Sequence, residues 1–208
     1  MAYYKLGSYV NTSRCNCIGQ ADKNSRYLFY VPFNAKANED GKDVLVIMLN
    51  PSSSAKAHVF YNIPFAQLED IDKSTNNVLS VLNKGINLTN IRTQVKSVTL
   101  LNLFPYFSPN QRDLNVVNNA SAFEMIRNEN TINKCLKKHR NGIVLVGWGK
   151  SMTNGLNANI YLRQIRKIKH LLAKSKCKCY QYDTKTTDFI SFDPNGRKCY
   201  VYHASSWR

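Results

Sequence analysis

Residues 43–54, D-V-L-V-I-M-L-N-P-S-S-S, decide the fold of this chain. The six consecutive apolar residues at 44–49 have the length and β-branched content of a strand that is buried on both faces. The strand ends at Asn50 and Pro51, because proline cannot donate to the ladder and disfavours helical angles in the residue before it. We therefore expect Asn50 to project from the carboxyl end of a buried strand, where open α/β sheets bind ligands.

The loop after this strand carries groups that could bind phosphate and a planar ring. Ser52, Ser53 and Ser54 can bind phosphate oxygens through their hydroxyls and backbone N–H groups. Phe60 or Tyr61, in A-H-V-F-Y-N, could stack on a planar ligand, although aromatic side chains at this spacing are equally typical of a core. The spacing leaves both alternatives open.

The rest of the chain alternates strand and helix patterns. Residues 74–84 predict a helix, and residues 97–104 predict a second buried strand. A third strand after residue 142 runs into G-W-G, an amphipathic helix follows at 158–174, and a last strand follows the D-P-N-G turn. We predict a single α/β domain over residues 1–208, with a three-layer αβα fold, a central mostly parallel sheet and residues 1–40 as a flanking edge segment.

The carboxyl ends of these strands would present Asn50, Asn102, the G-W-G turn and His203 at one edge. Asn102 interrupts an otherwise apolar strand, where an amide without partners is costly. It is therefore either a bridge to neighbouring backbone or a reader of a ligand. Gly147 and Gly149 would let another backbone approach beyond the end of the third strand.

The formal net charge of +16 and the sequence pI of about 9.7 favour a polyanionic partner, with nucleic acid first. Residues 130–182 contain no Asp or Glu, so the charge there has one sign. The alternative is a solvated helix face without a specific partner. The members of this block that we expect on a DNA-binding surface are Lys150, Arg163, Arg166, Lys167 and Lys169.

Neither a membrane segment nor a metal site is expected. No apolar stretch reaches the roughly 18 residues of a membrane span, and M-A-Y-Y-K-L-G lacks the apolar core of a signal peptide, so we expect a cytoplasmic protein. The six cysteines should then be reduced. The pairs Cys15/Cys17 and Cys177/Cys179 are spaced more closely than structural zinc ligands usually are, which favours half-buried strand thiols.

Four short motifs, taken in order, resemble those of the uracil-DNA glycosylase superfamily. M-L-N-P-S at 48–52 is similar to G-x-N-P-G, L-L-N at 100–102 to the strand that ends in a uracil-reading Asn, V-G-W-G at 146–149 to L-W-G, and H-A-S-S at 203–206 to H-P-S-P. R-Y-L, M-L-N-P-S, N-L-F-x-Y and W-G more closely resemble an uncharacterised bacterial family that is related to the superfamily and carried on mobile genetic elements. The resemblance covers roughly residues 26–208 as an ordered series of short motifs.

The resemblance implies a uracil-DNA glycosylase-like fold and a site for a base flipped out of DNA. Asn50 would hold the attacking water, Asn102 would read the edge of the base, and His203 would donate a hydrogen bond to a base oxygen. Phe60 or Tyr61 would stack on the base. No metal or organic cofactor is implied. The residues that would grip flanking phosphates are Ser52, Ser53, Ser54, Ser205 and Ser206.

The chain departs from the active branches at several motif positions. Met48 and Ser52 stand in place of glycines, Asn50 in place of the carboxylate of the most active branch, and Ala204 and Ser206 in place of prolines. These departures favour a pseudo-glycosylase that binds single- or double-stranded DNA, or that binds a glycosylase-directed inhibitor protein. We expect it to be a monomer. The alternative is an active glycosylase that hydrolyses the N-glycosidic bond of uracil or a related base in DNA.

Overall fold

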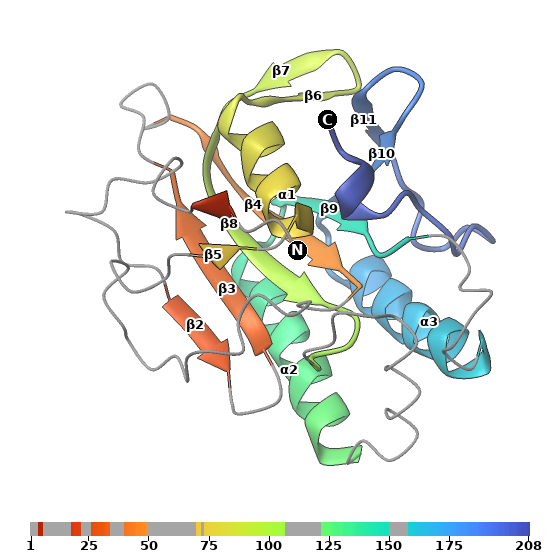
Figure 1. Cartoon of the computed structure of the whole chain (residues 1–208). Coiled ribbons are helices and arrows are strands. Elements are labelled where there is room, and N and C mark those ends of the chain that lie inside the picture. The colour runs from red at the N-terminus through yellow and green to blue at the C-terminus, as the bar shows by residue number, and fades with distance from the viewer. Residues whose placement is uncertain are drawn as a thin grey trace.

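The computed structural model describes residues 4–5, 18–21, 26–33, 40–49, 70–71, 73–106, 122–149 and 158–208. They form an α/β fold in which a nine-stranded sheet carries helices on both faces (Figure 1). A second, two-stranded sheet pairs β1 (Tyr4–Lys5) with β5 (Asp70–Ile71). Among the described helices, none is both long and apolar enough to cross a membrane.

The large sheet has the strand order β2-β3-β8-β4-β9-β10-β11-β6-β7 and is mixed. The central strands β8, β4, β9 and β10 are parallel, as the alternation of strands and helices predicts. The pairs β2–β3, β3–β8, β10–β11 and β6–β7 are antiparallel, whereas β11 and β6 are parallel, so the expected mostly parallel order holds at the centre and the sheet as a whole is mixed. The strands are β2 (Ile18–Ala21), β3 (Arg26–Pro32), β4 (Lys42–Met48), β6 (Ile86–Leu88), β7 (Ile91–Thr93), β8 (Val95–Asn102), β9 (Ile143–Gly147), β10 (Lys178–Asp183) and β11 (Asp188–Ser191).

Strand β4 is buried on both faces, which confirms the interpretation of residues 44–49. Alternate side chains of a strand point to opposite faces, so β4 contributes to two separate apolar clusters. One cluster joins Val44, Val46 and Met48 to helix α1 (Lys73–Asn83) and to Trp207 near the C-terminus. The other packs the opposite face against α2 (Ala122–Lys138) and α3 (Ala158–Lys174). Helices therefore cover both faces of the sheet.

The last part of the chain differs from the expected strand. Residues 198–202 form no strand, and only an isolated antiparallel bridge joins His203 to Trp148. The segment crosses the end of β9, where Trp148 Nε1 donates to the Cys199 carbonyl at 2.9 Å and the Val201 N–H donates to the Gly149 carbonyl at 3.3 Å. A short 3-10 helix, η5 (Ala204–Ser206), follows and lies against α1. This crossing brings His203 to the carboxyl edge of the sheet.

Candidate functional site

Three neighbouring parallel strands end at the same level of the sheet, so that their last residues are paired with one another. We call these paired residues the register row. Met48, the last residue of β4, is paired with Asn102, the last residue of β8, and with Gly147, the last residue of β9. The sequence predicted that these strand ends would meet at one edge, and for Asn102 and the G-W-G turn they do. Asn50, which follows Met48 by two positions, lies outside the described residues.

Asn102 is fully buried, with 0% of its surface exposed. The chain continues to bond to β4 after the strand ends, since the N–H groups of Leu103 and Phe104 donate to the carbonyls of Met48 and Leu49 at 2.8 and 3.0 Å. The backbone around Asn102 therefore belongs to the sheet rather than to a loose loop. The burial of Asn102 suits the first alternative, a structural bridge to neighbouring backbone.

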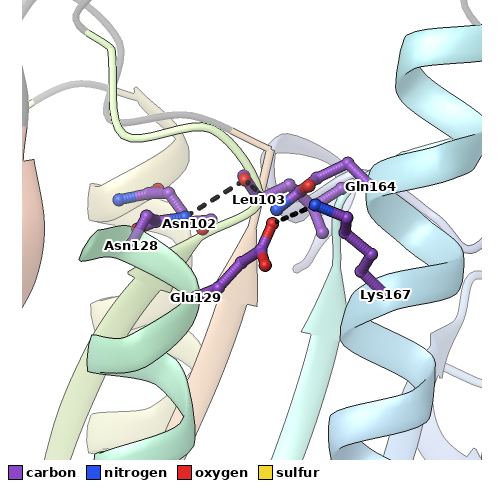
Figure 2. A network of polar contacts seen from close by, with 6 residues as sticks. All are labelled: Asn102, Leu103, Asn128, Glu129, Gln164 and Lys167. Atoms are coloured by element: carbon purple, nitrogen blue, oxygen red, sulfur yellow. Dashed lines mark hydrogen bonds and ion pairs between the residues drawn. The ribbon is translucent and has the colours of Figure 1, made fainter. Parts of the chain in front are cut away.

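Two buried amides, one from each helix on this face of the sheet, bind the end of β8 (Figure 2). Asn128 of α2 donates through Nδ2 to the carbonyls of Asn102 and Leu103 at 2.9 and 3.2 Å. Gln164 of α3 donates through Nε2 to the same Leu103 carbonyl at 3.2 Å. One carbonyl belongs to the last residue of β8 and the other to the residue after it, so the two amides satisfy acceptors at the strand end that burial would otherwise leave costly.

The sequence reasoning missed both amides, although each helix carries a signal. Asn128 stands one turn before the buried Ile132 of α2. Gln164 stands between Tyr161 and Ile168 on the apolar face of α3. A polar residue at a core position of an amphipathic helix needs a buried partner, and at the N-terminal half of these helices the partner is the end of a strand.

The G-W-G turn brings the His203 segment close, as predicted. Gly149 has φ +103°, and a Cβ there would lie 3.4 Å from His203 Cδ2. The hydroxyl of Tyr161 lies 3.3 and 3.1 Å from the carbonyls of Trp148 and Gly149. Burial, helped by Tyr200 and Cys199, raises the pKa of Tyr161 well above its usual range. Tyr161 therefore keeps its proton and acts as a hydrogen-bond donor to this turn.

The imidazole of His203 is oriented by its own helical turn. His203 is the N-cap of η5, and its Nδ1 accepts from the Ser205 N–H at 3.2 Å and lies 2.7 Å from Ser205 Oγ. Because Nδ1 accepts from a backbone N–H, the neutral ring carries its proton on Nε2. The Ser205 carbonyl in turn accepts from Asn77 Nδ2 of α1 at 2.7 Å. Ser205 thus positions His203, while Ser206 is exposed.

Core residues fill the row on the side that faces α1. A Cβ at Gly147 would lie 2.8 Å from Trp207 Cζ2 and 3.2 Å from the Cβ of Ala204. Met48 is 2% exposed and belongs to the same apolar cluster as Trp207 and Ala204. Met48 stands where the resembling motif has a glycine, so its side chain adds packing at this edge.

Of the predicted basic surface, three members are exposed on α3: Arg163, Arg166 and Lys167. We call these three residues the α3 cations. Lys167 also pairs with Glu129 of α2 at 2.8 Å, beside the end of β8 (Figure 2). The assignment of Lys169 to this surface was wrong: it is 6% exposed, and its ammonium donates to the carbonyls of Gly196 and Lys198 at 2.6 and 2.7 Å. The Lys169 ammonium therefore binds the backbone of a turn and is not available to a ligand.

Several predicted site residues cannot be placed. Outside the described ranges lie Asn50, Ser52, Ser53, Ser54, Phe60, Tyr61 and Lys150. Among the residues that are described, no group of three or more His, Cys, Asp or Glu side chains could hold a metal ion. Cys179 is buried in β10, and burial, together with Cys177, raises the pKa of its thiol to about 12. The Cys177 thiol lies 3.3 Å from the His139 carbonyl.

The described residues define an α/β protein with a polar edge at which parallel strands end. The chain belongs to the family described as "Protein of unknown function (DUF1643)", which matches residues 66–190. This span includes Asn102 and both helix amides but neither Asn50 nor His203. No curated protein matches the chain. No solved structure matches it.

Proposed function

We propose that this chain is a uracil-DNA glycosylase-like protein, of the kind carried by mobile genetic elements, that binds DNA and is impaired in catalysis. The observation that carries the proposal is the register row in which Asn102, Met48 and Gly147 are neighbours, with His203 bridged to the residue after Gly147. The four motifs of the resemblance are far apart in sequence. Residues of all four lie at one edge of the sheet, which is the edge where open α/β sheets bind ligands.

The hydrogen bonding of His203 is compatible with base binding. Nδ1 accepts from the Ser205 N–H, so the N–H of the neutral ring is at Nε2. An N–H donor suits a carbonyl oxygen of a pyrimidine, on which negative charge develops when the glycosidic bond breaks. This polarity is also the specific observation in favour of the second candidate, an active glycosylase.

The burial around Asn102 and Met48 supports impaired catalysis. A flipped base needs an open pocket whose polar groups face the ligand. Both side chains are almost fully enclosed, and Met48 packs with Trp207 in the core. The resembling motif has a glycine at the position of Met48, so the methionine side chain fills space that the glycine would leave open. These features favour retention of binding over retention of cleavage.

The α3 cations support DNA as the partner. Gln164 contacts the end of β8 from the helix that carries Arg163, Arg166 and Lys167, so positive charge lies beside the polar edge. Phosphate contacts of this kind release counterions and make affinity depend on salt. The alternative partner is a glycosylase-directed inhibitor protein, because it would bind the same edge and would not require this chain to cleave a glycosidic bond.

A glycosylase assay separates the two candidates. Single- and double-stranded oligonucleotides with one deoxyuridine are incubated with the chain, with the His203→Ala variant, and with His170→Ala as the matched control on the exposed side of α3. We expect no uracil release from any of them. Release that disappears in His203→Ala and persists in His170→Ala would contradict impairment and support the active enzyme.

DNA binding is tested by anisotropy across a salt series. A triple variant, Arg163→Gln/Arg166→Gln/Lys167→Gln, should bind DNA more weakly. The slope of log Kd against log salt should fall by up to about 3, or about 1 for each phosphate contact that is lost. The control removes the same charge elsewhere, through three exposed residues: Lys96, Lys185 and Arg197. If both variants weaken binding equally, the effect comes from the net charge of the protein and not from the α3 surface. If the affinity does not depend on salt, DNA is refuted as the partner.

A further inference from the structure

A cleft lies at the amino-terminal edge of the central strands, opposite the polar edge. Its volume is about 540 Å³, within the range of roughly 300–1,000 Å³ that is usual for small-molecule sites. Val44 of β4 is paired with Ile143 at the start of β9, which is paired with Lys178 at the start of β10, so the cleft runs across three strand beginnings. The β6–β7 hairpin, which joins its wall through Thr89 and Ile91, lies at the same end of the molecule (Figure 1). We call it the amino-edge cleft.

Three cations from three different elements line this cleft. Lys42 stands at the start of β4, Arg140 in the turn after α2, and Lys178 at the start of β10, and all three side chains are exposed. The one carboxylate in the described lining is Asp43, so these charges sum to three positive and one negative, or +2. Cations that line one concave site attract phosphate.

The carboxylate and the apolar part of the lining narrow the class of ligand. Asp43 accepts a hydrogen bond from Ser97 Oγ, which orients its carboxylate in the cleft lining and leaves acceptor capacity for a sugar hydroxyl. Tyr180 is half-buried in the wall, and Ile91 is 67% exposed although it is a large apolar residue. A tyrosine ring with exposed apolar surface suits the face of a planar ring.

We propose that the amino-edge cleft binds a nucleoside phosphate. Lys42, Arg140 and Lys178 bind the phosphate, Asp43 accepts from a sugar hydroxyl, and Tyr180 with Ile91 contacts the base. The cleft lies at the opposite end of the strands from Asn102 and His203 and shares no residue with the proposed base-binding edge. It therefore adds a second, independent ligand site to the molecule.

Calorimetric titration of the full chain tests this site. The probes are AMP, GMP, CMP and UMP, each beside its nucleoside, with inorganic phosphate as a further control. We expect at least one nucleotide to bind roughly tenfold or more tightly than its nucleoside and than inorganic phosphate, since both halves of the ligand are contacted. Equal affinity for inorganic phosphate, or no heat with any nucleotide up to millimolar concentration, would overturn the proposal.

Two charge-matched variants locate the binding. Lys42→Gln/Arg140→Gln/Lys178→Gln should lose roughly tenfold or more in nucleotide affinity, while the α3 variant Arg163→Gln/Arg166→Gln/Lys167→Gln should keep it. If the α3 variant loses nucleotide affinity and the cleft variant keeps it, the nucleotide binds at the α3 cations and the proposal is overturned. A single-stranded oligonucleotide distinguishes a free nucleotide from a strand: if it binds tightly and only the cleft variant loses it, the free nucleotide is refuted. Failure of DNA binding in the α3 variant leaves the cleft result unaffected, so the two proposals fail separately.

Discussion

The two tryptophans of the chain provide the sharpest test of the structure. Trp148 and Trp207 are both fully buried, but their indole N–H groups differ. Trp148 Nε1 donates to the Cys199 carbonyl at 2.9 Å, whereas Trp207 Nε1 has no partner among the described residues. The same substitution, Trp→Phe, therefore removes a hydrogen bond at one site and an unsatisfied donor at the other.

The expected magnitudes follow from this difference. Each substitution loses buried apolar atoms at roughly 1–2 kcal/mol. Trp148→Phe also leaves the Cys199 carbonyl unpaired, which adds about 1–3 kcal/mol, whereas Trp207→Phe relieves the cost of a buried donor by a comparable amount. Trp148→Phe should thus be less stable than Trp207→Phe by about 2 kcal/mol or more, or roughly 4–8 °C in Tm for a chain of this size.

Urea unfolding followed by far-UV circular dichroism measures the difference. Fluorescence is unsuitable, because each variant removes one of the two tryptophans. Similar m-values in both variants establish that the comparison concerns folded-state stability. If Trp207→Phe is as destabilising as Trp148→Phe, or more so, the assignment of the unpaired indole at the C-terminal segment is refuted.

Three further outcomes are expected. Gly147→Ala should lose roughly 1–3 kcal/mol in urea unfolding, because its Cβ would lie 2.8 Å from Trp207; a neutral effect would refute this close packing. Lys169→Met should lose about 1–3 kcal/mol by leaving two carbonyls unpaired, whereas Lys167→Met, whose side chain is 49% exposed, should lose less than about 1 kcal/mol; equal losses would contradict the buried ammonium. The unfolding free energy should fall as pH rises from about 9 towards 12, because the folded chain holds the Cys179 proton after the unfolded chain has released its own; Cys179→Ala should reduce that slope, and an unchanged slope would refute the raised pKa.

The centre of the fold was predictable from local pattern. An apolar run such as residues 44–49 has few alternatives to a doubly buried strand, and apolar positions one turn apart fix the inward face of α3. The edges were less predictable. β11 pairs antiparallel with β10, and residues 198–202 cross the end of β9 in place of joining the sheet. Their fates depend on partners distant in sequence, which periodicity does not encode.

The same distinction applies to single charged residues. Lys169 lies among exposed cations on α3, and its helical position alone suggests solvent. Its ammonium is instead bound by two carbonyls that follow it by 27 and 29 residues, in a turn that the helix pattern does not contain. A lysine stem can pass along apolar surface to such a partner, so position on a helix sets the direction of the stem but not the location of the charge.

Asn102 shows how far sequence reasoning reaches at the site itself. Its place at the end of a buried strand follows from the sequence, and the register with Met48 and Gly147 agrees with it. Whether it reads a ligand depends on what surrounds these strand ends, and the groups there come from α2, α3 and the C-terminal segment. Two of the three bind the carbonyls of residues 102 and 103, so they stabilise the strand end whether or not a base ever reaches it. Because this support does not depend on catalysis, the proposed function of binding without cleavage needs only the polar edge and the α3 cations beside it.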